Sequence, residues 1–161
     1  LIIGFLFKKR STIFVKKNML QRIQTIYLIL ASVISGGLIF VFSLWNTLKE
    51  QIFVLDLFFD ELFMLRVIPF MFITSSVLSF VTIFLFKDRK LQFVLGRIII
   101  LINLFLLGLL IYVSLTLPGE ASVSEKGIGM FLPILAILFL VLANKAIKKD
   151  EDLVKSVDRL R

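Results

Sequence analysis

Charged residues divide the chain into four long stretches that contain no Asp, Glu, Lys or Arg. The stretches hold 26, 20, 22 and 18 residues and run over positions 23–48, 67–86, 98–119 and 127–144. An α-helix rises about 1.5 Å per residue, so roughly 20 residues cross the ~30 Å hydrocarbon layer of a bilayer. The pattern therefore predicts four transmembrane helices, at about 23–44, 67–86, 98–116 and 128–145.

The apolar character of these stretches favours helices over every alternative. Inside a bilayer no water reaches the backbone N–H and C=O groups, so a spanning segment is a helix or part of a closed barrel. Barrel strands are short and alternate in polarity, whereas these stretches are long and apolar throughout. In addition, 59% of the 161 residues are hydrophobic, compared with about 45–50% in soluble domains. A buried hairpin in a soluble protein would need a large polar remainder, which this chain lacks, so we expect an all-α membrane protein.

The distribution of Lys and Arg sets the expected orientation in the membrane. Sixteen of the 19 basic residues lie in the N-terminal segment, the loop between the second and third stretches, and the C-terminal tail. With the 11 acidic residues included, those segments carry +11 and the other two loops −3, which sums to the formal charge of +8. The positive-inside rule therefore places both termini in the cytoplasm. We expect no nucleic-acid partner, because the charges are dispersed and lack interleaved exposed aromatics.

The expected domain organisation has three parts. Residues 19–146 form the four-helix transmembrane domain, and residues 147–161 form a charged cytoplasmic tail. Residues 1–18 are a basic N-terminal extension. Met19 precedes a short polar lead into the first helix and resembles an ordinary start. Two alternatives therefore remain for the extension: an upstream sequence that is not native, or a basic cytoplasmic arm.

The first outer loop combines apolar side chains with the acidic residues Asp56, Asp60 and Glu61. If this segment is helical, Asp56 and Asp60 share one face, and the segment lies in the outer membrane interface with its acids toward water. A short strand pair is the alternative. Carboxylates also suit a cation, but a solvated face is the ordinary explanation, and we expect no metal site. Trp45, just before the loop, has the position of an interfacial aromatic anchor.

Small and polar residues inside the predicted helices mark surfaces where helices pack closely. In the first helix, Ala31 and Ser35 are small residues four positions apart, and so are Ser32 and Gly36. Such pairs let another backbone approach. Asn103 in the third helix is expected to form an interhelical hydrogen bond worth about 1 kcal/mol.

The C-terminal tail is the expected contact surface for a partner. It either continues the fourth helix into the cytoplasm or bends along the membrane surface. As a helix it has an apolar stripe that includes Leu153 and Val157, and Glu151 and Lys155 form a favourable i,i+4 pair. The residues expected to contact a partner are Asp150, Asp152, Leu153, Val157, Asp158, Arg159 and Arg161.

Three stretches carry a family resemblance. They are LQRIQTIYLILA after Met19, LGRIIILINLFLLGLLIY at 95–112, and FLPILAILFLVLANKAIKKDEDLVKSVDRLR at 131–161. The closing LANKAIKKDEDLVKSVDRLR is the most specific. These stretches resemble the domain of unknown function family 4293, small bacterial membrane proteins, over residues 19–161. The resemblance implies a four-helix inner-membrane protein of bacteria, and it implies no activity.

Missing residue types exclude most membrane chemistry. The chain has no His, which excludes histidine-ligated haem, Ser–His hydrolysis and His-based zinc sites, and no Cys, which excludes thiol chemistry. The predicted spans hold no carboxylate for aspartyl proteolysis and no ionisable group for ion-coupled transport. We therefore expect neither an enzyme activity nor a cofactor.

Two functional interpretations remain. The first is a structural or accessory subunit of a membrane complex, in contact with the lipid bilayer and with a membrane-protein partner or further copies of itself. The second is a passive transporter or channel for a small uncharged or lipidic solute. A water-accessible polar face around Ser75, Ser79 and Asn103 would favour the second interpretation, and a dry, fully packed bundle would count against it.

Overall fold

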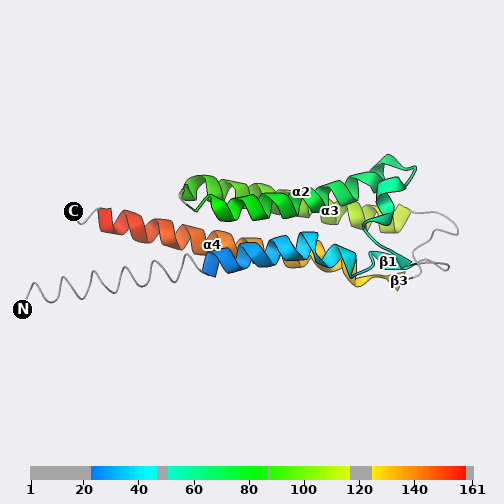
Figure 1. Ribbon diagram of the computed structural model, residues 1–161, viewed down its shortest axis with the longest axis horizontal. Helices are drawn as coiled ribbons and strands as arrows, with labels where there is room; N and C mark the ends of the chain where they lie inside the picture. Colours follow the sequence, from blue (N-terminus) through cyan, green and yellow to red (C-terminus); the bar gives the residue numbers. More distant parts are fainter. Residues whose placement is uncertain (1–22, 47–50, 87, 117–124, 159–161) are drawn as a thin grey trace, which may run out of the picture.

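Four long helices run side by side in the computed structural model, which describes residues 23–46, 51–86, 88–116 and 125–158 (Figure 1). The first helix covers residues 23–36 and continues through a turn into a 3-10 helix, η1 (Leu38–Phe40). The others are α2 (Phe63–Phe84), α3 (Arg89–Thr116) and α4 (Leu132–Asp158). All four segments are long and apolar enough to cross a membrane. The chain is therefore a multi-pass membrane protein, as its sequence predicts.

The second and third helices begin earlier than the charge pattern predicts. α2 begins at Phe63 rather than near residue 67, which places Pro69 inside the helix instead of in its first turn. α3 begins at Arg89 rather than near residue 98, and Arg97 lies exposed on its surface. Charge limits how deep a residue sits in the bilayer but not whether its backbone is helical, so helices extend past their apolar spans.

The first and last helices also differ from expectation. The first, expected to reach residue 44, is α-helical only to residue 36, where Gly36 and Gly37 end it. The fourth segment, expected over 128–145, opens with a 3-10 helix, η4 (Ile128–Phe131). α4 then runs without a break to Asp158. The tail therefore continues the last helix and does not bend along the membrane surface within the described residues.

The helices pack through their inner faces and leave apolar side chains exposed on the outside. One core cluster surrounds Trp45 and Phe72, and a second surrounds Leu28 and Leu140. On the outside, Leu101 and Phe105 of α3 are 63% and 64% exposed, as are many of their apolar neighbours. Exposure of so much apolar surface to water would be unfavourable, whereas its contact with apolar lipid tails is not.

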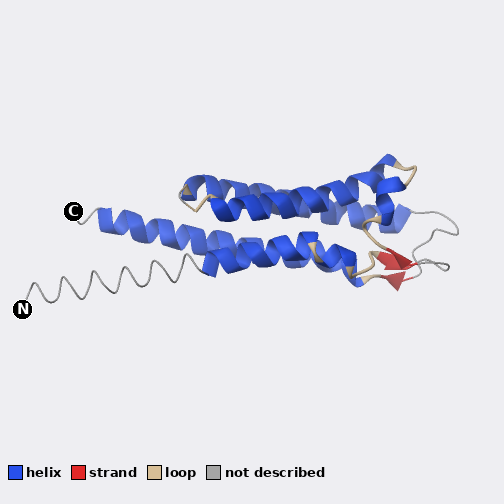
Figure 2. Cartoon of the chain, viewed as in Figure 1, coloured by secondary structure: helices blue, strands red, loops and turns tan. Residues whose placement is uncertain are grey.

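A small sheet joins the loops at one end of the bundle (Figure 2). The strands are β1 (Trp45–Asn46), β2 (Gln51–Ile52) and β3 (Glu125–Lys126), in the antiparallel order β2-β1-β3. We call this end of the bundle the sheet end. The opposite end, which holds the turn between α2 and α3 and the last turns of α4, we call the basic end; the charge pattern predicts that it is cytoplasmic.

Two glycines connect the start of the fourth segment to the end of the first. The backbone N–H of Gly127 donates to the carbonyl of Leu44 over 2.9 Å, and that of Gly129 donates to Ser43 over 2.8 Å. A Cβ on Gly127 would collide with the Ser43 carbonyl. Only glycine therefore allows these two backbones to approach so closely.

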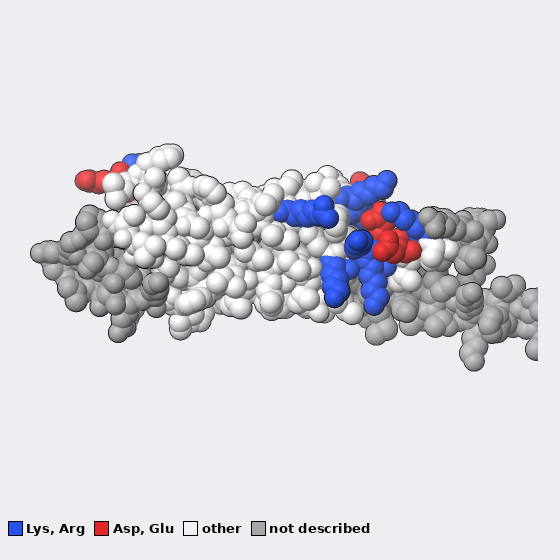
Figure 3. All heavy atoms as spheres, turned by 180° about the vertical axis from the view of Figure 1, so that it is seen from behind, with Lys and Arg blue, Asp and Glu red and all other residues white. Residues whose placement is uncertain are grey.

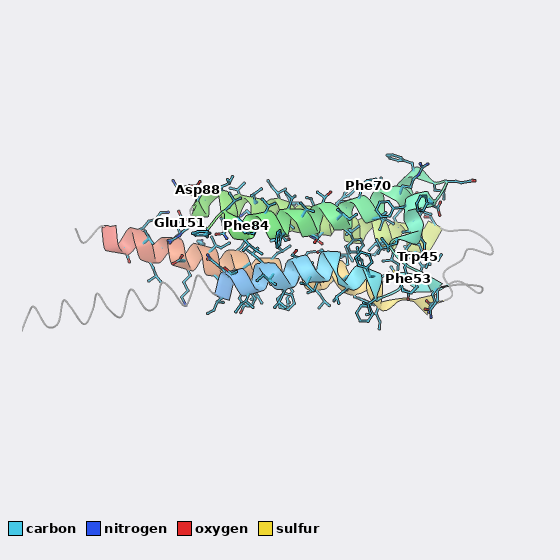
Figure 4. The ribbon with its side chains drawn as sticks, in the orientation of Figure 1. Trp45, Phe53, Phe70, Phe84, Asp88 and Glu151 are labelled. Atoms are coloured by element: carbon cyan, nitrogen blue, oxygen red, sulfur yellow. The ribbon has the colours of Figure 1, made fainter. Side chains whose placement is uncertain are left out.

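Trp45 is not the interfacial anchor that its position suggested. It lies in β1 and is fully buried in the core cluster at the sheet end, where no described group accepts a hydrogen bond from its indole Nε1. In β1 the indole therefore faces the core cluster at the sheet end of the bundle, where Figure 4 labels it.

The outer loop contains both of the alternatives that its sequence allows. A strand pair, β1 and β2, precedes a single 3-10 turn, η2 (Asp56–Phe59). The Asp56 carboxylate accepts the Phe53 backbone N–H over 2.8 Å, and that of Asp60 accepts the Leu62 N–H over 3.0 Å. These acids therefore hold turns in place, and the extended backbone at Asp60 ends the helix before it can align the two acids on one longer face.

Candidate functional site

The first helix and α2 approach closely at a pair of serines. Ser76 Oγ donates to the Ser32 carbonyl over 3.0 Å, and Ser32 Oγ donates to the Ser76 carbonyl over 3.2 Å. Gly36 lies one turn further along, where a Cβ would collide with Ser76 Oγ. Ala31 and Ser35, the other small residues singled out in the first helix, are both buried. The small-residue face is thus turned toward α2, inside the chain.

Asn103 links three helices near the middle of the bundle. Its Nδ2 donates to Ser75 Oγ of α2 over 2.6 Å and to the Ile99 carbonyl of its own helix over 2.9 Å. Ser75 Oγ in turn donates to Ser35 Oγ of the first helix over 3.3 Å. The expected interhelical hydrogen bond of Asn103 is present, and it is the start of a chain from α3 through α2 to the first helix.

Replacing Asn103 with Leu is expected to lower the free energy of unfolding by about 1 kcal/mol, the size of an interhelical hydrogen bond in a membrane. The measurement is an unfolding titration in SDS followed by circular dichroism. Ser114→Ala is the matched control, because Ser114 Oγ is exposed and bonds only to the Ile111 carbonyl within α3. Equal effects of the two substitutions would show that Asn103 does not link the helices.

Buried polar side chains continue from Asn103 toward the basic end. Gln92 Nε2 of α3 donates to the Thr82 carbonyl near the end of α2 over 3.2 Å, and Gln92 is 1% exposed. Gly96, one turn further along α3, lies against Asn144 of α4: a Cβ there would collide with Asn144 Oδ1. We call this set of buried groups the polar track; it consists of Gln24, Ser35, Ser75, Ser79, Thr82, Gln92, Asn103 and Asn144.

Several oxygens of the polar track lack a donor among the described residues. They are Gln24 Oε1, Ser79 Oγ, Gln92 Oε1, Asn103 Oδ1 and Asn144 Oδ1. Each costs about 1–3 kcal/mol if it stays without a hydrogen bond. The groups are amides and hydroxyls, which hold hydrogen bonds but do not titrate near neutral pH. They are suited to positioning, to water and to uncharged solutes, and not to acid–base catalysis.

An ion pair closes the polar track at the basic end. Arg89 Nη2, from the first residue of α3, lies 3.3 Å from Asp150 Oδ2 of α4, and Arg89 Nη1 lies 3.4 Å from the Asp150 backbone carbonyl. The side chains are 18% and 1% exposed. Asp150 was expected to face a partner, whereas the structure buries it inside the chain. Its role is therefore to attach α4 to the start of α3.

Beyond Asp150, α4 carries four of the other predicted contact residues, Asp152, Leu153, Val157 and Asp158. Asp152 is exposed, while Leu153 and Val154 are half-buried. Glu151 Oε1 and Lys155 Nζ form the expected pair at 2.8 Å, near Asp88 on the turn from α2 (Figure 4). The side chains of Val157 and Asp158, and all of Arg159 and Arg161, lie outside the described residues. Residues 1–18 of the expected extension lie outside them as well.

Two hollows lie on the outside of the bundle. One is apolar and is lined by residues of α3 that include Leu101, Phe105 and Gly108. The other lies at the basic end and includes Asp88 and Glu151. Neither is lined by the serines or the asparagines of the polar track. Within the described residues, no three His, Cys, Asp or Glu side chains gather in a way that would hold a metal ion.

A comparison with protein families matches almost the whole chain. The model of the family described as "Domain of unknown function (DUF4293)" matches residues 20–160. The chain belongs to this family. Neither a curated protein nor a solved structure matches this DUF4293 member. The family match covers all four helices and the polar track, so these features lie within the DUF4293 domain of this chain.

The sequence pattern of this DUF4293 protein pointed to Ser35, Ser75, Ser79 and Asn103 but not to the members of the polar track nearer the basic end, such as Gln92 and Asn144. Gln92 lies in the predicted loop between the second and third spans, and Asn144 lies at the end of the fourth span, so a polar residue needs no explanation at either position. The one available signal was spacing: Gln92, Gly96 and Asn103 are four and seven positions apart, which places them on one face of a helix. This spacing indicates a common face only if residues 92–103 are helical, and the charge pattern predicts a helix only from about residue 98, whereas α3 begins at Arg89.

Proposed function

We propose that this DUF4293 protein is a structural or accessory subunit of a membrane protein complex and has no catalytic activity or cofactor of its own. The observation that carries the proposal is the projection of α4 past the turn between α2 and α3 at the basic end (Figure 1). The helix continues from Asp150, where it is attached to Arg89, to Asp158. At 1.5 Å per residue this projection reaches about 12 Å beyond the ion pair.

The projecting turns have the features of a docking helix. The buried Arg89–Asp150 ion pair attaches the helix to the bundle, so little further ordering would be needed when a partner binds. Leu153 and Val154 supply apolar surface, and exposed charges such as Asp152 surround it. This combination of an apolar centre and a polar rim is typical of a protein contact.

The proposed location is the bacterial inner membrane, with both termini in the cytoplasm. Its support is the asymmetry of charge along the bundle. Among the described residues, the basic end carries Arg89, Lys90, Arg97, Lys145, Lys148, Lys149 and Lys155. The sheet end carries two basic residues, Arg66 and Lys126, together with four acids, Asp56, Asp60, Glu61 and Glu125. Basic residues favour the cytoplasmic side of a bacterial membrane.

The test of the proposed function is a truncation that keeps the anchor. A chain that ends at Asp150 retains the ion pair with Arg89 but lacks the projecting turns. We expect the full-length protein to migrate in native gels as a defined complex with a second membrane protein. The truncated chain should migrate without that partner while its circular dichroism in detergent stays helical.

A point substitution makes the same test without shortening the chain. Val154→Asp is expected to weaken the complex by about tenfold or more, because burial of one such side chain is worth roughly 1.5–3 kcal/mol. Leu138→Asn, at a lipid-facing position that is 54% exposed, is the control for a general effect on the membrane helix. A full-length protein that purifies alone, and at the same size as the truncated chain, would overturn the accessory role.

One observation favours the second candidate, a passive pathway for a small uncharged solute. The unpartnered oxygens of the polar track extend from Asn103 to the basic end, and such groups exchange hydrogen bonds with a passing solute. Ser75, Ser79 and Asn103 are nevertheless fully buried at 0% exposure, which places the accessory role first. Uptake of glycerol into liposomes, compared between the native protein and Asn103→Leu, tests this alternative.

A further inference from the structure

A group of exposed cations covers one face of the bundle at the basic end. Figure 3 shows the Lys and Arg side chains gathered there, with a few acids toward the tip of the bundle and an uncharged middle. Four exposed basic residues at this end come from two adjacent helices: Lys90 and Arg97 of α3, and Lys145 and Lys149 of α4. Arg97 and Lys145 lie deepest, closest to the apolar middle.

The contact between Gly96 and Asn144 places Arg97 and Lys145 next to each other. α3 and α4 are antiparallel, and each cation is the residue that comes directly after a member of this contact. Along an α-helix each residue is rotated by about 100° from the one before it. In two antiparallel helices, the residues that directly follow two facing residues therefore point toward the same side of the helix pair. Both residues are exposed, so this side is the outer surface.

These two cations lie at the boundary between lipid headgroups and hydrocarbon. Arg97 is eight residues beyond Arg89 in α3, and Lys145 is five residues before Asp150 in α4. At 1.5 Å per residue, both lie about 7–12 Å inward from the Arg89–Asp150 ion pair. Long basic side chains at this depth extend toward the interface and keep their charge near the headgroups.

Arg97 is held in that direction by an aromatic ring. Its guanidinium carbon lies 4.4 Å from the centre of the Phe93 ring, one turn closer to the basic end. The cation–π contact fixes the stem of the side chain and leaves the guanidinium edge, with its five N–H donors, free to bind an anion.

No described acidic side chain neutralises this pair of cations. Asp150 is paired with Arg89, and Glu151 with Lys155, both further toward the tip. The exposed acids Asp88 and Asp152 also lie at or beyond the level of the ion pair. Two like charges side by side at low dielectric repel each other, so an external anion would stabilise them.

The surface next to the cations toward the sheet end is apolar. Leu101 lies one turn beyond Arg97 on the same face of α3 and is 63% exposed, and Val141 lies one turn before Lys145 on α4 and is 49% exposed. A ligand that fits both parts has an anionic head and an apolar tail. We propose that this face of α3 and α4 binds an anionic phospholipid, with the phosphodiester between Arg97 and Lys145 and an acyl chain along Leu101 and Val141.

The test is the binding of dioleoyl phosphatidylglycerol to the delipidated full-length protein, measured by native mass spectrometry in mild detergent, with dioleoyl phosphatidylcholine as the neutral competitor. We expect one phosphatidylglycerol to bind saturably and phosphatidylcholine to compete poorly. Each basic residue near a membrane contributes roughly a factor of five in affinity. The double variant Arg97→Gln/Lys145→Gln is therefore expected to bind phosphatidylglycerol about 25-fold more weakly.

A matched charge change separates this site from general attraction to positive charge. Arg66→Gln removes one exposed arginine from the sheet end and should leave the affinity within about twofold, whereas Arg97→Gln should lower it about fivefold. Circular dichroism of each variant reports whether the helices are intact. Equal affinities of the native protein and the double variant, or equal binding of the two lipids, would overturn the proposal. Neither result depends on whether α4 binds a partner protein.

Discussion

Gly96→Ala is expected to lower the free energy of unfolding by about 2–3 kcal/mol, even though alanine is the better helix former. A Cβ at position 96 would collide with Asn144 Oδ1 and lie 2.8 Å from Asn144 Cγ. Asn144 is only 7% exposed, so its side chain has little space to move away. The substitution would push α3 and α4 apart at the point where the polar track crosses between them.

Gly108→Ala is the matched control, because it makes the same change in the same helix. An added Cβ on Gly108 meets nothing within 4 Å. Only the helix propensity changes there, so we expect a stability that is equal to that of the native protein or higher by up to about 1 kcal/mol. Unfolding in SDS or by heat, followed by circular dichroism in one detergent, measures both variants.

A second substitution tests the cause of the Gly96 effect. If steric contact is responsible, Gly96→Ala combined with Asn144→Ala should recover most of the lost stability, because the space that the Cβ needs is then free. The same loss for Gly96→Ala and Gly108→Ala would mean that glycine flexibility, and not close contact, explains position 96.

Arg89→Met is the second substitution with a large expected effect, about 2–4 kcal/mol of lost stability. It keeps most of the aliphatic stem but leaves the Asp150 carboxylate, which is 1% exposed, without its cation. Asp150→Asn should cost less, about 1 kcal/mol, because Arg89 is 18% exposed and can turn its charge toward water. The measurement is the same unfolding titration.

A double substitution separates the ion pair from the packing around it. Replacing both partners with apolar residues, Arg89→Met and Asp150→Leu, removes the buried charge altogether, and such replacements are often neutral or stabilising. We therefore expect the double variant to be more stable than Arg89→Met alone. If Arg89→Met had no effect, Asp150 would have to be satisfied by something other than Arg89, and the attachment of α4 would need another explanation.

The number of helices and their membrane character could be predicted from the sequence alone. Both depend on quantities that a linear pattern contains: the length of each uncharged stretch and the absence of water in the bilayer, which requires every backbone group to bond within its own helix. The small-residue face of the first helix and the hydrogen bond of Asn103 could be predicted by similar reasoning. Ser32, Gly36 and Asn103 are polar or small at depths where only a neighbouring helix provides a partner.

Helix ends and the environment of single residues could not be predicted in this way. Charge marks where the hydrocarbon layer ends, but the helical backbone can continue beyond that point. α3 consequently begins at Arg89 and α4 runs on to Asp158. Trp45 likewise has the residue type and sequence position of an interfacial anchor. It lies in β1, however, which pairs with strands on both sides, and its indole is buried in the core.

The class of the protein follows from its sequence, because the length and polarity of each segment decide whether it can cross a membrane. Which polar groups meet depends instead on how the helices pack. The contact of Gly96 with Asn144 and the ion pair of Arg89 with Asp150 join residues 48 and 61 positions apart. Such contacts depend on the relative shift and rotation of two helices. These are set by the packing of all four helices and cannot be derived from the sequence of either helix alone.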